Sequence, residues 1–585
     1  MGDGKGIVSF VSNYSWSSEP SFVVLREHLL NNFDKIWIEN MHGNRKITEY
    51  APDGKTSETV FAVKGFSAGI QQGVTISLWV KNGRGDGKAE VYYRDDLHDA
   101  RAEERRKHLL ATLDEENFQE NFVKANADRE NRFSFRPSDV SDEYQNWAKL
   151  TDIAARLPEQ GLLECRGGAL IDIDKNDLSE RMKKYFDANV SWEDLEKLET
   201  GLTKDMARFD SKKTRAKVTL AENFSDKRIK RYAIRAFDSR WCYFSSIRPL
   251  WNEPRPQFVQ QITDENMFLV SRPAGVASPE GVPFYFVRGF ADYDLLRGHA
   301  RYFPFRLRVV AQSKENQPSL LGETEETFTA NLSAKARNYL RDLGADDPDE
   351  SADAASLIWL HALAIGYAPL YLTENADGIR SDFPRIPLPA ELEILQTSAR
   401  RGRRIAELLD TERATAETDG LPFTAIGVIS RVADGQIRIE SGELEISAGW
   451  GSGGKGGITM PGKGKTVKRD YTPGELKILE ESAARFSLSA GEITQILGAQ
   501  TFDVYLNDAA FWRNIPAAVW EYTIGGYQVL KKWLSYREAA VLGKSLTADE
   551  AREVSSIVRR ITAILLLSKD LNANYKACKS SEFKL

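Results

Sequence analysis

The strongest constraint on the fold is an alternation of strand and helix patterns in the first 95 residues. Short β-rich runs at 6–12, 34–41, 59–64 and 73–81 accompany a segment at 19–33 whose apolar residues recur at helical spacing. The run at 73–81 (GVTISLWVK) is apolar enough for a buried strand. The order predicts the carboxy-terminal half of a doubly wound α/β sheet. Such a half sheet exposes an unpaired strand edge and an uncovered apolar face, so we expect another element to complete it.

The length of 585 residues predicts three or four hydrophobic cores. From residue 96 to residue 221 the pattern becomes helical and highly charged, which indicates a helical coupler that spaces two working parts. Beyond it, aromatic-rich strands and helices are mixed, as in an α+β domain. We therefore expect four parts, at 1–95, 96–221, 222–390 and 391–585.

Cysteine and histidine usage argues against disulfides and metal sites. The three cysteines, at 165, 242 and 578, are too few and too scattered for either, and the six histidines lack ligand spacing. We therefore expect no metal. The sequence also lacks a run of about 18 apolar residues and an amino-terminal secretion signal, which predicts a soluble, cytoplasmic protein without a membrane partner.

A basic segment lies within this acidic chain, whose formal net charge is −6. Residues 204–256 contain fourteen Lys and Arg against six Asp and Glu, a local excess of +8 that would attract phosphate groups. Aromatic residues are interleaved with these charges, including Tyr232, Trp241 and Trp251. The alternative is a solvated charged face over an aromatic core, and composition alone does not separate the two.

A glycine- and lysine-rich stretch at 449–468 (GWGSGGKGGITMPGKGKTVK) has no periodicity and predicts a loop. A phosphate-binding P-loop fails on spacing, because Gly464-Lys465-Thr466 would require glycine where Thr459 stands. We interpret the stretch as a flexible basic loop that lies on a DNA backbone.

Several strings, in order along nearly the whole chain, resemble type ISP restriction-modification enzymes, in which a methyltransferase core precedes a helical coupler and a target-recognition domain. The strings are GIVSFVSNYSW, FVVLREHLLNNFDKIWIENMHGNRK, PDGKTSETVF, GVTISLWVK, IKRYAIRAFDSRWCYF, FADYDLLRGHARYFPFRL, ALAIGYAPLYL, SDFPRIPLP and FWRNIPAAVWEYTIGGYQVLKKWLSYR. Arg235 would match the arginine before the family's Pro-Phe-Asp, although Ala236 stands where proline is usual. The resemblance implies adenine-N6 DNA methylation, phage defence and double-stranded DNA as the partner.

Two motifs that such a methyltransferase needs are missing. The family transfers a methyl group from S-adenosylmethionine, held at a glycine-rich turn, to an extruded adenine bound by an Asn-Pro-Pro-Tyr-type loop. The chain has 21 prolines and no two are adjacent. We therefore expect S-adenosylmethionine to serve the complete enzyme but not to bind this chain alone, and catalysis to require a separately encoded amino-terminal methyltransferase or nuclease part.

Candidate residues near the extruded base follow from the same resemblance. The turn before the strand at 73–81 would lie beside the base, which makes Ile70, Gln71 and Gln72 candidates. Asn13 and Tyr14 follow the first strand and lie on the same carboxyl edge of the sheet. The alternative is that all five are ordinary loop residues.

Candidate DNA contacts come from the basic segment. Four arginines could bind guanine bidentately or grip phosphate, and a second set would contact phosphate: the first set is Arg235, Arg240, Arg248 and Arg255, and the second is Lys227, Arg228, Lys230 and Arg231. Asp238 is expected to pair with Arg240 or Arg235. Asp382 and Arg385 are expected either to brace a rigid connection or to lie at a domain joint, and Gly525 and Gly526 to form a tight turn.

Three hypotheses remain. The chain is the recognition part and partial methyltransferase fold of an adenine-N6 DNA methyltransferase, a stand-alone sequence-specific DNA-binding or regulatory protein without catalysis, or an inert fragment.

Overall fold

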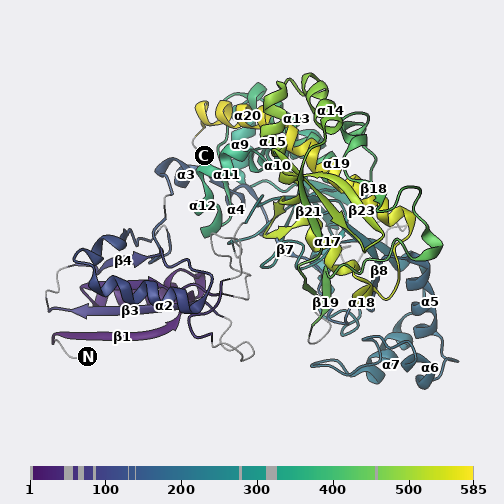
Figure 1. Cartoon of the computed structure of the whole chain (residues 1–585), viewed down its shortest axis with the longest axis horizontal. Helices are drawn as coiled ribbons and strands as arrows, with labels where there is room; N and C mark the ends of the chain where they lie inside the picture. Colours follow the sequence, from purple (N-terminus) through teal and green to yellow (C-terminus); the bar gives the residue numbers. More distant parts are fainter. Residues whose placement is uncertain are drawn as a thin grey trace, which may run out of the picture. The chain divides into compact units, whose positions relative to one another are not determined.

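The computed structural model describes residues 4–44, 57–62, 72–83, 87–129, 131–138, 140–275, 280–310, 326–454 and 459–583. The chain divides into two compact units (Figure 1). The first comprises residues 1–142 with 276–279, and the second comprises residues 143–275 with 280–585.

The first unit is built on a mixed five-stranded sheet with the order β1-β3-β2-β4-β5. Its strands are β1 (Gly6–Asn13), β2 (Lys35–Asn40), β3 (Val74–Lys81), β4 (Glu90–Arg94) and β5 (Val123–Ala125). Strand β3 lies between β1 and β2 and is antiparallel to both, whereas β2 and β4 are parallel. Strands β1, β2 and β4 therefore run in one direction and end at the same edge of the sheet.

Helices cover both faces of this sheet. Leu29 and Leu30 of α1 (Val23–Asn32) pack with Ile36 of β2, and Leu109 of α2 (Ala102–Ala111) packs against a second cluster that contains Val74 of β3. Ile36 pairs with Trp79 of β3, so these two side chains lie on one face of the sheet. Val74 is five residues from Trp79 on the same strand, and because side chains alternate between faces, it lies on the opposite face with the second cluster. This layering agrees with the predicted α/β class. The strand directions differ from a simple parallel winding, because β3 returns antiparallel between β1 and β2.

The described residues of the second unit form three four-stranded sheets. The first is β13 (Phe290–Ala291), β9 (Ile229–Arg235), β10 (Asp238–Tyr243) and β8 (Ile171–Asp172); the second is β12 (Tyr285–Val287), β11 (Phe268–Ser271), β14 (Arg301–Pro304) and β7 (Glu159–Gln160); the third is β18 (Val428–Arg431), β23 (Ala510–Pro516), β22 (Gln500–Tyr505) and β21 (Thr466–Asp470). Four short pairs accompany them: β15 (Arg306–Val310) with β16 (Glu326–Ala330), β17 (Arg385–Ile386) with β6 (Ala148–Lys149), β19 (Gly451–Gly453) with β20 (Thr459–Pro461), and β24 (Thr523–Ile524) with β25 (Tyr527–Gln528).

The α-helices after residue 141 are α3 (Asp142–Asn146), α4 (Leu150–Ile153), α5 (Lys175–Phe186), α6 (Trp192–Glu196), α7 (Ser211–Ala221), α8 (Pro256–Val259), α9 (Ala334–Asp342), α10 (Ala352–Gly366), α11 (Pro369–Glu374), α12 (Ala376–Ser381), α13 (Leu392–Leu409), α14 (Pro473–Ser482), α15 (Ala490–Leu497), α16 (Ala517–Trp520), α17 (Val529–Arg537), α18 (Ala539–Leu542), α19 (Ala548–Leu566) and α20 (Ser568–Ser580). Thr547 and Glu550 form a capping box that starts α19.

Across the described ranges, no helix is both long and apolar enough to cross a membrane.

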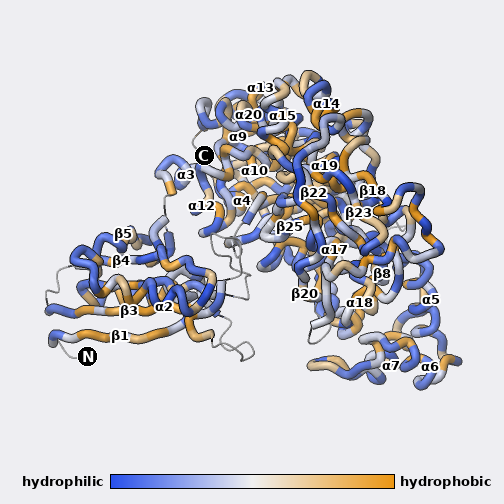
Figure 2. Tube along the Cα trace, viewed as in Figure 1, coloured by the Kyte–Doolittle hydropathy of each residue, from blue (hydrophilic) through white to orange (hydrophobic). Residues whose placement is uncertain are grey.

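Helix α10 forms the centre of the second unit and is hydrophobic along most of its length (Figure 2). It packs against α13 at Gly402, where a Cβ atom would lie 1.8 Å from the carbonyl oxygen of Leu360. Only a residue without a side chain allows this approach of the two helices.

The predicted coupler at 96–221 does not form a body of its own. The boundary between the compact units lies at residue 142, inside the predicted coupler. Strand β7 pairs with β14, and β8 pairs with β10, so residues after 142 complete sheets of the second unit. Helical spacing could not reveal these strands, because each is two residues long.

Two local predictions agree with the structure. Gly525 and Gly526 have φ angles of 51° and 79° and form the turn between β24 and β25. Asp382 forms an ion pair with Lys149 at 2.9 Å, and Arg385 donates a hydrogen bond to the carbonyl of Trp147. Both side chains therefore brace the proline-rich connection in which they lie.

Candidate nucleic-acid interface

The hairpin β9–β10 carries the arginines that the sequence singled out. Its turn is Ala236-Phe237, and Phe237 adopts the left-handed conformation with φ of 59°. The Phe237 N–H donates to the hydroxyl of Tyr285 at 2.8 Å, and both turn residues are buried. These contacts fix the turn even though Ala236 replaces the proline of the resembling family.

Arg235 and Arg240, which flank this turn, are held in ion pairs. Arg235 Nη1 lies 2.7 Å from Asp292, and Arg240 Nη2 lies 3.0 Å from Asp238. Asp238 also accepts Arg537 at 3.0 Å, and the Asp238 and Arg537 side chains are each 1% exposed. Burial alone would raise the pKa of Asp238, but Arg240 and Arg537 outweigh it and hold that pKa well below its usual range. The expected pairing of Asp238 with Arg240 is thus present.

The other predicted DNA contacts differ in whether a carboxylate already pairs with their side chain. Lys227 and Lys230 are exposed, and neither makes an ion pair with a described carboxylate. The rest are paired: Arg228 with Glu222 at 2.7 Å, Arg231 with Glu412 at 2.7 Å, Arg248 with Glu253, and Arg255 with Glu253 at 3.8 Å. Among the described residues, Lys227 and Lys230 are therefore the exposed cations of the set without a carboxylate partner, and contact with DNA stays a prediction for all eight residues.

The aromatic residues interleaved with these charges lie mostly inside the fold. Tyr232, Phe237, Tyr243 and Trp251 are at most 3% exposed. Trp241 is half-buried, and the Arg231 guanidinium lies 4.7 Å from its ring centroid. The alternation of aromatic and basic residues thus reflects strands with one face in the core, and does not form a stacking surface.

A cationic cluster forms where this hairpin meets α17. Lys532 Nζ lies 5.2 Å from the ring centroid of Tyr527 and 4.5 Å from that of Tyr536. The guanidinium carbon of Arg235 is 5.5 and 5.6 Å from the same two centroids, and that of Arg240 is 5.0 Å from Tyr536. Three cations from two distant segments therefore converge on two tyrosine rings.

The sequence does not reveal this cluster, because Lys532 lies in a run, WEYTIGGYQVLKKWL, that is dominated by apolar and aromatic residues. One signal was present. Lys532 and Tyr536 are four residues apart, which places them on one face of a helix. Pairing that face with the Arg235 hairpin required the three-dimensional structure.

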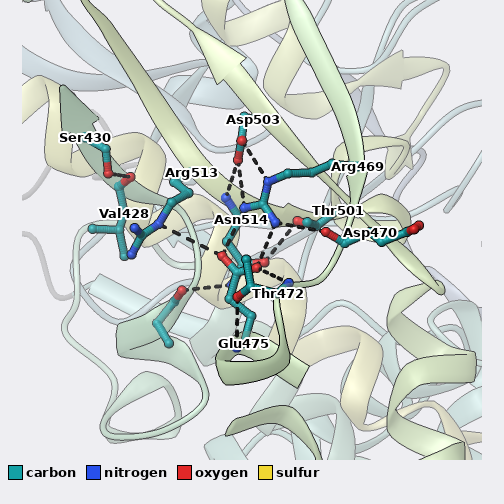
Figure 3. Close-up of polar contacts among 11 residues, drawn as sticks. Val428, Ser430, Arg469, Asp470, Thr472, Glu475, Thr501, Asp503, Arg513 and Asn514 are labelled. Carbon is teal, nitrogen blue, oxygen red and sulfur yellow. Dashed lines mark hydrogen bonds and ion pairs between the residues drawn. The ribbon is translucent and has the colours of Figure 1, made fainter. Parts of the chain in front are cut away.

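A second polar cluster lies on the sheet β18-β23-β22-β21 (Figure 3). Arg469 bridges two carboxylates, with Nη1 2.7 Å from Glu475 and Nε 2.8 Å from Asp503. The Asn514 N–H donates to Asp503 at 3.0 Å, and Arg513 is 4.0 Å from Glu475. Two arginines face two acids, so this network is charge-balanced and stabilises the register shift beside Asp503.

The glycine- and lysine-rich stretch is more regular than the predicted loop. Strands β19 and β20 pair within it, and the Trp450 N–H donates to Glu538 at 2.7 Å. Gly464 lies against the Trp450 ring, where a Cβ atom would come within 2.1 Å. Lys465 forms an ion pair with Asp508 at 2.7 Å. The tight packing on Trp450 explains Gly464, and contact of the stretch with a DNA backbone stays a prediction.

The predicted surroundings of an extruded base lie in the first unit. Asn13 ends β1 and Tyr14 follows it at the edge where β2 and β4 also end. The Tyr14 N–H donates to the carbonyl of Gly73 at 3.0 Å, so exposed Gln72 is close to this pair. Ile70 and Gln71 lie outside the described residues. The structure thus brings Asn13, Tyr14 and Gln72 together, and their role stays a prediction.

Further polar groups share this edge. Asn44 Nδ2 donates to the Tyr14 hydroxyl at 2.8 Å, and Asp95 accepts from Asn40 at 2.7 Å and lies 3.1 Å from His42 Nε2. Burial would raise the pKa of Asp95, but His42 and Arg136 lower it to about 2. Within the described ranges, no three His, Cys, Asp or Glu side chains group as metal ligands.

Comparisons with solved structures give the same overall fold. The ATP-dependent Type ISP restriction-modification enzyme LlaBIII bound to DNA matches with a TM-score of 0.59 and 14% identity, over 98% of this chain and 33% of that one. The DrdV-DNA complex matches with a TM-score of 0.58 and 17% identity, over 97% and 50%. A nuclease-deletion mutant of the Type ISP enzyme LlaGI with a DNA substrate mimic matches with a TM-score of 0.57 and 15% identity, over 98% and 46%.

The chain spans between a third and a half of the length of these solved chains. No curated protein sequence matches it. The family model described as the Type ISP C-terminal specificity domain matches residues 156–565, which include the β9–β10 hairpin and α17. The protein belongs to the Type ISP C-terminal specificity domain family.

Proposed function

We propose that this chain recognises a target sequence in double-stranded DNA as the specificity part of a restriction-modification enzyme. The observation that carries the proposal is the match of the specificity-domain family across residues 156–565. The exposed Lys227 and Lys230, and the cluster at Lys532, lie in that range and supply positive charge for phosphate groups.

Duplex selection from a randomised library, with the full chain as bait, tests the proposal. We expect enrichment of one sequence and binding that weakens steeply with salt. Reversal of the two exposed charges (K227E with K230E) should weaken binding to all duplexes and lower the salt slope by about 2, at roughly 0.9 per phosphate contact.

The matched control is K335E with K576E, which makes the same change of net charge at two exposed lysines elsewhere in the second unit. A selection that enriches no sequence would contradict target recognition. Equal losses in the two double variants would contradict the role of Lys227 and Lys230.

Methyl transfer is the finer part of the proposal. The chain contains no adjacent prolines, so an Asn-Pro-Pro-Tyr-type loop must come from another polypeptide segment. β1 is an outer strand of the described sheet, and Ile7 and Val11 on it are 69% and 51% exposed. Such an apolar edge suits a further part of an α/β methyltransferase that supplies the S-adenosylmethionine site and adds to the sheet.

Calorimetry and methyl incorporation test this part. The chain alone should bind no S-adenosylmethionine and should methylate no DNA, while addition of the amino-terminal methyltransferase part should restore adenine methylation. Activity of the chain alone would contradict it. Site-selective DNA binding by a chain that never associates with such a part would instead favour a regulatory DNA-binding protein without catalysis.

A further inference from the structure

Lys532 stands out among the cations around Tyr527 and Tyr536 because its charge is not balanced. Arg235 pairs with Asp292, and Arg240 and Arg537 share Asp238. Nζ of Lys532 lies over the two rings, and no carboxylate among the described residues lies within ion-pair distance of it. When Lys532 is protonated, its charge therefore has no anion beside it among the described residues.

The surroundings of Lys532 oppose its protonated form. Burial, followed by the positive charges of Arg235 and Arg297, lowers the pKa of Lys532 to about 7, and Asp238 only partly offsets them. The tyrosine rings attract an ammonium group electrostatically, but they carry no counter-charge. An oxyanion beside Nζ would supply the missing charge.

We propose that Lys532, held between Tyr527 and Tyr536 in the positive field of Arg235 and Arg240, binds one phosphate group. The inference rests on the proposed function, in which that phosphate belongs to a DNA backbone. An ammonium with three donors and two neighbouring phenol hydroxyls can all donate to phosphate oxygens. The site takes any phosphate whatever the base, so it would contribute affinity and register and not sequence choice.

The arginine network around Arg469 differs from the Lys532 cluster because its cations are already paired with carboxylates. Its two arginines are matched by Glu475 and Asp503, and Arg469 binds both carboxylates (Figure 3). An incoming phosphate there would compete with carboxylates already in place. At Lys532 it would meet a cation whose hydrogen-bonding capacity is unused.

Substitution of Lys532 by methionine tests the site, since it removes the charge and keeps the length of the side chain. The control is Lys531→Met, because Lys531 is the neighbouring half-buried lysine of α17 and burial alone lowers its pKa. With a labelled 30-base-pair duplex of mixed sequence at about 0.1 M salt, we expect K532M to weaken binding about tenfold and to lower the salt slope by about 1. K531M should bind like the unmodified chain.

Protection from acylation provides a readout that needs no variant. An amine with a pKa of about 7 is largely unprotonated above neutrality and reacts readily with acetic anhydride. The duplex should protect Lys532 and raise its pKa, whereas Lys531 should react equally with and without DNA. The groups that face Lys532 are Arg235 from β9, Asp238 and Arg240 from β10, Arg297, Tyr527 from β25 and Tyr536 from its own helix.

The pH dependence of binding follows from the same change. Because phosphate favours protonated Lys532, binding takes up a proton above the pKa of the free site, and affinity should fall by up to about tenfold per pH unit between pH 7 and pH 8.5. K532M should remove this slope. Unchanged affinity, salt slope and pH dependence in K532M would overturn the site while leaving DNA recognition intact, provided the unmodified chain binds the duplex.

Inorganic phosphate at constant ionic strength separates the two sources of the group. If it protects Lys532 at millimolar concentration while the duplex does not, the site binds free phosphate, and the DNA assignment is overturned. If the unmodified chain binds no duplex at all, the proposed function fails as well. Protection by the duplex, with loss of binding in K532M alone, supports the site on DNA.

Discussion

Replacement of Asp238 by asparagine would test how the β9–β10 hairpin is held. The carboxylate lies 3.0 Å from both Arg240 and Arg537, and all three side chains are at most 11% exposed. Asn keeps the size and one hydrogen-bond acceptor, but it leaves buried Arg240 without a counter-charge and Arg537 with only Glu553, at 3.6 Å. Breaking such a buried pair costs about 3–5 kcal/mol, and D238N should destabilise the second unit by that amount.

An exposed pair at the same hairpin, with Arg231 on β9, supplies the control. Arg231 and Glu412 lie 2.7 Å apart, but their side chains are 34% and 42% exposed. Solvent screens this pair, so E412Q should cost no more than about 1 kcal/mol. The two variants remove the same charge from one unit and differ in burial.

Urea unfolding followed by tryptophan fluorescence measures both variants. The pH supplies a second check, because arginine contacts keep the pKa of Asp238 below its unfolded value. The stability that it contributes is present above a pH of about 4 and fades as the pH falls further, so the difference between D238N and the unmodified chain should be constant from pH 8 to pH 5 and shrink below pH 4. A cost for D238N no larger than that of E412Q would refute the reasoning.

Three further predictions concern the second unit. Gly402→Ala should lower the free energy of unfolding by about 3 kcal/mol or more in urea, because the new Cβ would clash with the Leu360 carbonyl. The control is Gly474→Ala on α14, where a Cβ would meet no other atom, and it should change that free energy by less than about 1 kcal/mol. Burial lowers the pKa of His361 to about 4, so stability should fall from pH 7 to pH 5 by about 2 kcal/mol, and His361→Gln should remove that slope in the same urea assay. A thiol reagent should label Cys165 rapidly in the native protein and all three cysteines only after denaturation, because the other two are buried.

Parts of the fold could be predicted from the sequence because they depend on neighbours along the chain. A period-two pattern placed β2, and a continuous apolar run placed β3, within a residue or two, and the glycine pair at 525 and 526 indicated its turn. Two-residue strands such as β7 and β8 carry no periodic signal, and they exist only because long-range partners complete them. This is why the sequence did not show that residues 143–221 of the predicted coupler belong to the second unit.

The candidate site was predicted less completely than the fold, for an electrostatic reason. A count of charges located the basic segment, but it could not show that Glu412 and Asp292, distant in sequence, neutralise Arg231 and Arg235. The count of charges also did not identify Lys532, because this residue lies in a run dominated by apolar and aromatic residues. The functional weight of a cation depends on its uncompensated charge, and this is a property of the folded chain.

A comparison of free energies assigns different roles to the cations around the hairpin. A bidentate contact between arginine and guanine gives about 1–3 kcal/mol of discrimination, whereas removing a buried guanidinium from its carboxylate costs about 3–5 kcal/mol. Arg235 and Arg240 would therefore lose more by leaving Asp292 and Asp238 than they would gain from a base edge. Lys227, Lys230 and Lys532 have no such contact to give up. This comparison favours the lysines as the groups that bind phosphate. The paired arginines stabilise the hairpin and contribute the positive electrostatic potential around Lys532.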